Sequence, residues 1–154
     1  MSVRDEDLAC PDCAAPMELA IGYGGRQYYR CERYPDCHGA HGAHPDGSPM
    51  GEPADARTRQ ARILAHEALD KLWMDAPLMY GAEALDPEKV KRFRRIARVR
   101  AYDWLAAKMG GAYMHIGDAD MQACRDIIAI CNRATPEIVR AWAKSNADDQ
   151  RRAR

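Results

Sequence analysis

The chain has 154 residues, 47% of them hydrophobic and 30% charged, and its 23 basic and 23 acidic side chains give a formal net charge of zero. This length suits one ordinary domain, or a mini-domain followed by a modest helical one. The acidic start of the chain and the lack of any apolar run near the ~20 residues that span a bilayer argue against a secretory signal and a membrane anchor. We therefore expect a soluble cytoplasmic protein.

The charge is distributed unevenly along the chain. Residues 1–55 contain 4 Lys and Arg against 10 Asp and Glu, whereas residues 56–154 contain 19 against 13. Affinity for nucleic acid that does not depend on sequence comes mainly from Lys and Arg neutralising phosphates. The front of the chain is therefore expected to bind nucleic acid only weakly by itself.

The first predicted element is a β-hairpin. Met17, Leu19 and Ile21 occur at every second position, which is the period of a strand with one buried face. Residues 22–25, Gly-Tyr-Gly-Gly, can reverse the chain because glycine adopts positive φ easily. Residues 26–31 then form the returning strand.

Two pairs of cysteines frame this hairpin: Cys10-x2-Cys13 and Cys31-x5-Cys37. In a reducing compartment this spacing favours a metal site. Four thiolates complete the tetrahedral sphere of one Zn²⁺ and leave no position for substrate, so the predicted zinc is structural. A hairpin of about thirty residues buries too little apolar surface to fold without such support. The alternatives are two disulfides or a Cys10/Cys13 redox pair, although a redox pair normally begins a helix in an α/β fold.

Residues 38–55 are rich in Gly, Pro, Ala and His and show no period, so we expect an irregular connector and a domain boundary near residue 53. Imidazole is a good zinc ligand, but four cysteines already suffice. We therefore predict that His38, His41 and His44 are solvated.

The remainder is predicted to be helical. Asp55 should cap a first helix, and Asp86-Pro87 should open a second that ends at Gly110-Gly111. Their buried faces are expected to hold, for the first, Ala61, Leu64, Ala65, Ala68, Leu69, Leu72 and Trp73, and for the second, Val90, Phe93, Ala97, Ala101 and Trp104.

Two further helices are predicted, one from about Asp118 and one from Thr135-Pro136. They should bury Met121, Cys124, Ile127, Ile128 and Cys131, and Val139 and Trp142, respectively. The tail has too little apolar content to order itself. The predicted fold is thus α+β: a β-hairpin with its connector over residues 1–53, a small all-α helical bundle over 54–147, and a disordered tail over 148–154.

Residues 89–100 contain seven basic side chains in twelve positions and no acidic one. On a helix, Lys91, Arg94, Arg95 and Arg98 form a stripe beside the apolar face. Such a stripe can contact phosphates or an acidic partner. The alternative is a solvated basic face, which is the commoner outcome for runs of charge.

Few other motifs suggest chemistry. Residues 66–70, His-Glu-Ala-Leu-Asp, lack the second histidine of a metalloprotease helix, and we expect a local hydrogen bond between His66 and Asp70. Cys124 and Cys131 are expected to pack as small apolar residues, and His115 to cap or pack. A hydrolase that used His66, Asp70 and His115 would need a second metal. We expect no enzyme activity.

The segments CPDCAAPMEL and CERYPDCHGA resemble the zinc ribbons at the C-terminus of bacterial type IA topoisomerases. That resemblance implies binding of single-stranded DNA through exposed aromatic and basic side chains. The aromatic candidates are Tyr23, Tyr28, Tyr29 and Tyr34, and the phosphate contacts are Arg26, Arg30 and Arg33. Alternatively, two of the tyrosines, Tyr29 and Tyr34, form the core of the mini-domain.

Most of the chain, in particular AHPDGSPMGEPADARTRQARILAHEALDKLW, AYDWLAAKMG and HIGDADMQACRDIIAIC, is similar to a family of zinc-finger-containing proteins from phages and prophages. This resemblance implies a phage origin and the cytoplasm of a bacterial host. It supplies no mechanism.

Two functional hypotheses follow. The first is a phage or prophage accessory protein that binds nucleic acid, in particular single-stranded DNA, without catalysis. Its contacts would be Tyr23, Tyr28, Arg26, Arg30, Lys91, Arg94, Arg95 and Arg98. The second is a protein-interaction module that docks on and modulates or inhibits a host enzyme, such as a nuclease, polymerase or defence complex, through its acidic front.

Overall fold

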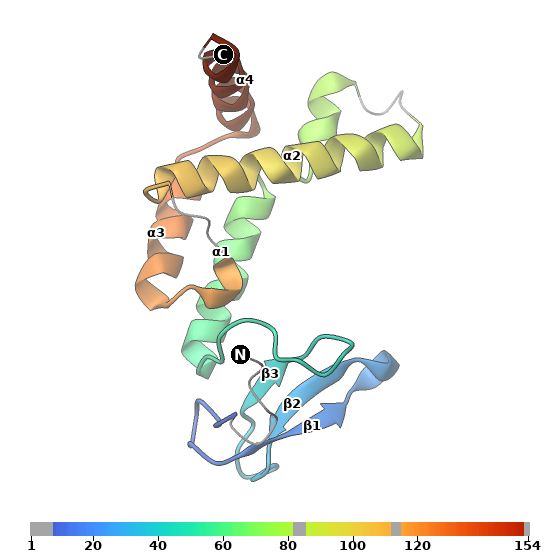
Figure 1. The fold of residues 1–154 in the computed structure, drawn as a ribbon, viewed down its shortest axis with the longest axis vertical. Helices are drawn as coiled ribbons and strands as arrows, with labels where there is room; N and C mark the ends of the chain where they lie inside the picture. The colour runs from blue at the N-terminus through green and yellow to red at the C-terminus, as the bar shows by residue number, and fades with distance from the viewer. Residues whose placement is uncertain (1–7, 82–85, 112–114, 153–154) are drawn as a thin grey trace. The chain divides into compact units, whose positions relative to one another are not determined.

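The computed structural model describes residues 8–81, 86–111 and 115–152 as a small antiparallel sheet followed by helices (Figure 1). The predicted α+β fold class is confirmed. Contacts between residues divide the chain into two units, Met1–Gln60 and Ala61–Arg154. The boundary near residue 53 stays a prediction, because helix α1 (Ala56–Asp70) runs through the point where the two units divide.

The sheet consists of β1 (Met17–Ile21), β2 (Gln27–Cys31) and β3 (Ala40–Gly42), antiparallel and in that order. The 3-10 turn η2 (Tyr23–Gly25) joins the first two strands and contains two glycines at positive φ. The predicted hairpin is thereby confirmed. The third strand falls in the segment predicted to be irregular, because its three residues, Ala-His-Gly, are too few to show alternation.

The core of the first unit lies at the cysteine end of the sheet. Besides cysteines, its buried members are Leu8, Met17, Tyr29 and Ala43. The hydroxyl of Tyr29 donates a 2.6 Å hydrogen bond to the carbonyl oxygen of Gly47 and so ties β2 to the following loop. The prediction that Tyr29 belongs to the core is confirmed.

Other predictions about this unit are wrong. Tyr34 is 50% exposed, and the strand residues Leu19 and Ile21 are 40% and 75% exposed. His41, expected in solvent, is buried on β3. Alternation identifies the side chains that share a face of a strand, but it does not reveal how far another segment covers that face.

The first helix, α1, begins as predicted. The backbone amide of Thr58 donates to the Asp55 carboxylate at 2.8 Å, which is an N-cap. Along α1 the buried side chains are Ala61, Ala65, Ala68 and Leu69. The expected burial of Leu64 is wrong, since it is 45% exposed. Its position at the edge of the apolar stripe explains this, because a surface helix buries only part of its circumference.

After the 3-10 segment η3 (Ala76–Tyr80), helix α2 (Pro87–Lys108) begins where predicted. The Asp86 carboxylate accepts a 3.0 Å hydrogen bond from the amide of Lys89. The helix ends at the two predicted glycines, with φ of 105° at Gly110 and 87° at Gly111. Ala101 and Trp104 are buried as expected, while Val90, Phe93 and Ala97 are only partly buried.

The chain continues through the 3-10 turn η5 (Ile116–Asp118) into α3 (Met121–Asn132) and α4 (Pro136–Arg152). The N-cap of α3 is Asp120, whose carboxylate accepts from the amide of Ala123 at 2.8 Å, so the predicted start near residue 118 is too early. Helix α4 begins where predicted and extends into the segment 148–154 for which disorder was expected.

The core of the second unit brings the helices together. Its buried members include Leu69 from α1, Trp104 and Leu105 from α2, and Cys124 and Ile127 from α3. Val139 and Trp142 of α4 are buried and partly buried against this cluster, as expected. Within the described ranges of the chain, no helix combines the length and apolar character that crossing a membrane requires.

Candidate metal centre and binding surfaces

The four cysteines of the two predicted pairs converge in the first unit. The sulfur atoms of Cys10, Cys13, Cys31 and Cys37 all lie within 4.8 Å of one another. The Sγ–Sγ distance is 3.7 Å between Cys10 and Cys37 and 3.5 Å between Cys13 and Cys31. A tetrahedron of sulfurs ~2.3 Å from Zn²⁺ has edges of about 3.8 Å, so the arrangement fits one zinc ion. All four cysteines are free, which argues against the disulfide alternative.

Local backbone hydrogen bonds shape the two cysteine turns. In the first, the amide of Cys10 donates to the carbonyl of Ala15 and the amide of Ala14 donates back to Cys10, both at 2.7 Å. Ala14 has a φ of 61°, which reverses the chain directly after Cys13. In the second turn, the amide of Arg33 points at the sulfur of Cys31 at 3.4 Å. These contacts orient the two turns so that their sulfurs face one another.

Gly39 was not singled out in the sequence, yet it stands against the metal centre. A Cβ atom built on Gly39 would collide with the sulfur of Cys10. The backbone of Gly39 is also held in place, because its carbonyl oxygen accepts a 2.9 Å hydrogen bond from the amide of Cys31. Space, and not an unusual backbone angle, therefore requires glycine at this position.

The environments of the sulfurs differ. A hydrogen bond from the amide of Ala15 lowers the pKa of Cys13 to about 7, whereas burial raises the pKa of Cys31 to about 12. A buried thiol becomes a metal ligand only when it loses its proton, and a divalent cation provides the positive charge that stabilises the thiolate. The donor set and its burial thus suit a structural zinc ion.

An acidic side chain next to the metal centre connects it to helix α1. Within the first unit, the carboxylate of Asp12 accepts from the backbone amide of Ala56 at 3.2 Å and forms a 3.4 Å ion pair with Arg59. Asp12 lies between Cys10 and Cys13 in the first cysteine turn. Its role could not be predicted from sequence, because its partners are more than forty residues away.

The model of a family described as a zinc-finger-containing domain matches residues 8–134 of this chain. The chain belongs to that family. The match includes all four cysteines of the metal centre and most of the helical unit, so the zinc-finger-containing domain extends well beyond the sheet. A comparison with curated proteins and one with solved structures found no significant match.

Among the aromatic candidates of the zinc-finger-containing domain, Tyr23 is fully exposed, at the turn η2 between β1 and β2. Arg26, which follows this turn, is exposed as well. Tyr28 and Arg30 lie on the face of β2 opposite Tyr29 and are half-buried. The structure thus brings Tyr23 and Arg26 to the hairpin tip and leaves the strand candidates less accessible.

Arg30 and Tyr34 interact with each other on the surface. The guanidinium of Arg30 lies 5.1 Å from the ring centre of Tyr34 and forms a 2.5 Å hydrogen bond with Glu18. The ring of His38 meets that of Tyr34 edge to face at 5.3 Å. A phosphate at Arg30 would meet the neighbouring carboxylate of Glu18, whereas Tyr34 is half exposed and available for stacking.

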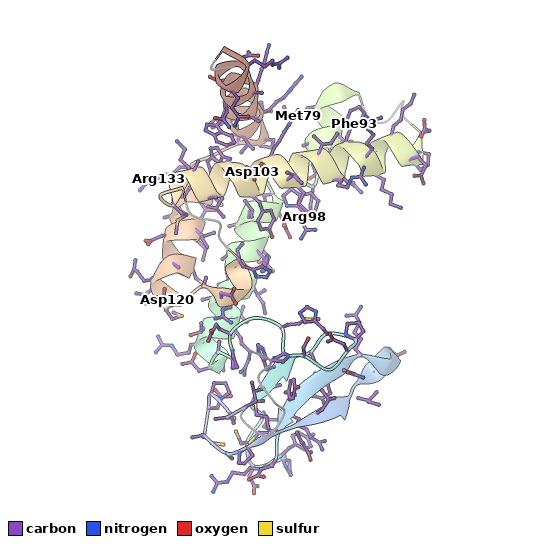
Figure 2. The ribbon with its side chains drawn as sticks, in the orientation of Figure 1. Met79, Phe93, Arg98, Asp103, Asp120 and Arg133 are labelled. Carbon is purple, nitrogen blue, oxygen red and sulfur yellow. The ribbon has the colours of Figure 1, made fainter. Side chains whose placement is uncertain are left out.

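The side chains of the predicted basic stripe on α2 have different surroundings. Lys91 is exposed, and Arg94 donates from Nε to the backbone carbonyl of Met74 at 2.9 Å. Arg98 packs its guanidinium over Trp73 and Tyr102, at 5.7 Å and 5.5 Å from the ring centres. Figure 2 shows Phe93 and Arg98 on different sides of α2.

Two hollows in the second unit flank α2. One, of about 370 Å³, is lined by side chains of α1, α2 and η5 that include Arg95, Arg98, His66 and His115. We call it the arginine–histidine pocket. The other, of about 380 Å³, lies between α2 and α4 and is called the α2–α4 groove. Its lining comprises Phe93, Ile96, Arg100, Arg140, Ala143, Lys144, Ala147 and Arg151.

The residues considered for hydrolysis are arranged differently from the prediction. Asp70 accepts a 2.8 Å hydrogen bond from the indole of Trp73, and Nδ1 of His66 lies 3.5 Å from the hydroxyl of Tyr102. The expected pairing of His66 with Asp70 is therefore wrong. His115 caps η5 by accepting from the amide of Gly117 at 3.2 Å, as expected.

The two remaining cysteines behave as predicted. Cys124 and Cys131 are buried in the helical core, and burial raises the pKa of both thiols, that of Cys131 to about 11. Thiols in this state react and bind metals poorly. Within the part of the chain that the structure describes, the only group of three or more metal-binding side chains is the four-cysteine centre.

Proposed function

We propose that this zinc-finger-containing protein binds single-stranded nucleic acid, with DNA as its ligand, and that it does so without catalysis. One observation carries the proposal: the ring of Tyr23 is fully exposed at the tip of a hairpin whose other end is held by the metal centre. Exposed aromatic rings with nearby arginines are the elements with which proteins stack and neutralise single strands. Arg26 supplies the adjacent positive charge.

The sheet by itself is a poor electrostatic match for DNA, because residues 1–55 have an excess of acidic side chains. Helix α2 would provide the missing charge through Lys91, Arg94, Arg95 and Arg98. In this proposal the hairpin contributes stacking and α2 contributes phosphate contacts. The resemblance of the connector and helical segments to a phage and prophage family supports an accessory role in a phage or prophage, acting in the cytoplasm of a bacterial host.

Titration of the zinc-loaded chain with labelled single-stranded and double-stranded oligonucleotides at several salt concentrations tests this proposal. We expect tighter binding of the single strand and an affinity that falls steadily with salt. Tyr23→Ser should weaken binding about 5- to 100-fold, the effect of losing one stacked base. Ile21→Ser, which removes an exposed apolar side chain from the same hairpin, is the matched control. Absence of salt-sensitive binding at low ionic strength would contradict the proposal.

The contribution of α2 needs its own variant. Reversal of Arg94, Arg95 and Arg98 to Glu should abolish binding, provided that circular dichroism shows the helices intact. Reversal of three exposed arginines elsewhere, Arg57 of α1, Arg125 of α3 and its C-cap Arg133, changes the net charge equally and is the control. Equal affinity of both variants would reject the role of α2.

The α2–α4 groove favours a second candidate function, docking of a partner protein that the domain would modulate or inhibit. The floor of the groove is apolar, with Phe93 and Ile96, and its rim carries Arg100, Arg140 and Lys144. This combination complements an amphipathic helix of a partner that buries apolar side chains and presents carboxylates to the rim. A nuclease, polymerase or defence complex of the host is the class of partner that we expect.

An acidic amphipathic model peptide labelled with a fluorophore tests the groove. Binding that survives nuclease treatment and is lost in Lys144→Glu would support docking. Arg125→Glu on α3 is the matched control. If the peptide binds both variants equally, the groove is not its site.

A further inference from the structure

The arginine–histidine pocket collects donors of hydrogen bonds from three elements of the second unit. Arg95, Arg98 and Tyr102 come from α2 and His66 from α1, and His115 is the N-cap of η5. Val99 and Ile116 add an apolar wall. Asp103 is the one carboxylate in the lining. The set is rich in donors and poor in acceptors, which is the chemistry of an anion site.

The two arginines of this pocket outnumber its one lining carboxylate among the described residues, Asp103. Within the described ranges, neither Arg95 nor Arg98 forms an ion pair with a carboxylate. Arg98 is nonetheless held in place, because its guanidinium lies over the rings of Trp73 and Tyr102. Stacking on ring faces leaves the N–H edges of a guanidinium free to form forked hydrogen bonds with an oxyanion.

Each of the two histidines has its Nδ1 engaged within the protein. Nδ1 of His115 accepts a hydrogen bond from the amide of Gly117, so the neutral ring carries its proton on Nε2. His66 is half-buried, and desolvation lowers its pKa against the opposing effect of the Asp70 carboxylate, with smaller lowering contributions from His115 and Arg98. At neutral pH it is therefore uncharged, and its Nδ1 lies 3.5 Å from the hydroxyl of Tyr102. While that hydrogen bond is formed, either Nε2 of His66 or the hydroxyl of Tyr102 can donate to a ligand, but not both.

We propose that the arginine–histidine pocket binds a phosphomonoester of mononucleotide size through Arg95, Arg98, Tyr102, His66 and His115. The assignment of this ligand to a nucleic acid rests on the proposed function. Two ligands carry such a phosphomonoester: the phosphorylated 5′ end of a strand and a free nucleoside monophosphate. Asp103 would then accept from hydroxyl or amino groups of the nucleoside.

Three features favour a terminal phosphate over one within a strand. A phosphomonoester carries a charge of about −1.5 to −2 at neutral pH, which two guanidinium groups match. It offers three oxygens, enough for donors that approach from three elements. The volume of about 370 Å³ lies at the small end of the range for ligand pockets, and it suits one nucleotide.

Competition binding with the zinc-loaded full chain tests the pocket. The probes are a 12-mer of deoxythymidine with a 5′ phosphate, the same strand with a 5′ hydroxyl, AMP, and adenosine. We expect the phosphorylated strand to bind at least about tenfold more tightly than the hydroxyl strand, the difference that charged hydrogen bonds produce. Arg95→Gln and Tyr102→Phe should erase this preference. Arg92→Gln, an equal loss of charge at an exposed position of α2 outside the pocket, should preserve it.

The outcomes separate the two proposals. Strong competition by AMP would identify a free nucleotide as the ligand, and preference confined to the strand would identify its 5′ end; both support the pocket. Equal binding of both strands, together with equal competition by AMP and adenosine, would overturn the pocket but leave nucleic-acid binding intact. Binding of AMP that the pocket variants abolish, without binding of any strand, would retain the pocket and overturn the proposed function.

Discussion

The two units of this zinc-finger-containing protein reach stability by different physical means. The first has a small core of Leu8, Met17, Tyr29 and Ala43 grouped around four sulfurs, whereas the second buries a continuous apolar cluster drawn from its helices. Apolar burial supplies the folding free energy of an ordinary domain, but a unit this small needs another source. We therefore expect the fold of the first unit to depend on zinc and that of the second unit not to.

The largest effect should come from removal of the metal. Structural zinc contributes on the order of 10 kcal/mol to the folding of small zinc units at neutral pH. A strong chelator, or Cys31→Ser, should therefore unfold the first unit and leave α2, α3 and α4 folded. Amide NMR spectra would record this as loss of dispersion for residues 8–50 only. If the helical signals were lost as well, the second unit would also depend on zinc, contrary to this prediction.

A cavity in the helical core should have the converse effect. Leu105 of α2 is 1% exposed in the core of the second unit, so Leu105→Ala should lower the free energy of unfolding of that unit by about 2–5 kcal/mol. Thermal melts followed by helical circular dichroism measure the shift, and elemental analysis should still find one zinc per chain. A variant that lost its zinc would show that the metal centre depends on the helical core.

The metal centre can be perturbed without removing a ligand. Gly39→Ala places a methyl group against the sulfur of Cys10, so the affinity for zinc should fall about 10- to 100-fold, as when groups that position ligands are altered. Competition with a chromophoric chelator measures this affinity. In Gly22→Ala, in the same unit, the added methyl group would meet the ring of Tyr28 at 3.3 Å and the carbonyl oxygen of Arg26 at 3.5 Å, so the effect should be much smaller. Equal affinities would refute the steric role of Gly39.

The smallest of these effects concerns a helix cap. Asp120→Ala removes the acceptor for the amide of Ala123 at the start of α3 and should cost about 1 kcal/mol. The loss should be confined to the helical unit and visible in its chemical denaturation. Asp126→Ala, at an exposed position within α3, should change stability by less than about 0.5 kcal/mol. Similar losses for both variants would mean that charge, and not capping, is responsible.

Local signals in the sequence were accurate predictors of where elements begin and end. Asp55 and Asp86 cap the helices that they were predicted to cap, and α2 ends just before Gly110 and Gly111. These signals act between neighbours along the chain, so one sequence suffices to read them. The start of α3 is the exception, because several acidic residues precede it and Asp120 is the one that caps.

Burial at the edge of an element was predicted less well. Leu64 and Ile21 have apolar side chains at the expected period, yet both are exposed. Tyr34 was left open between an exposed stacking residue and a member of the core, and it packs on the surface against Arg30 and His38. Periodicity orients a side chain relative to its own element, but exposure depends on what the rest of the chain places above it.

The sequence by itself determined the metal centre and the order of elements, because cysteine spacing and helix caps depend on residues close together in the chain. Only the tertiary structure decided that Gly39 must remain small beside Cys10, and that His66, Arg98 and His115 share one pocket. It also decided that the basic run of α2 contributes to two different hollows. Such contacts join residues distant in sequence, and packing, which no local pattern encodes, sets the distances between them.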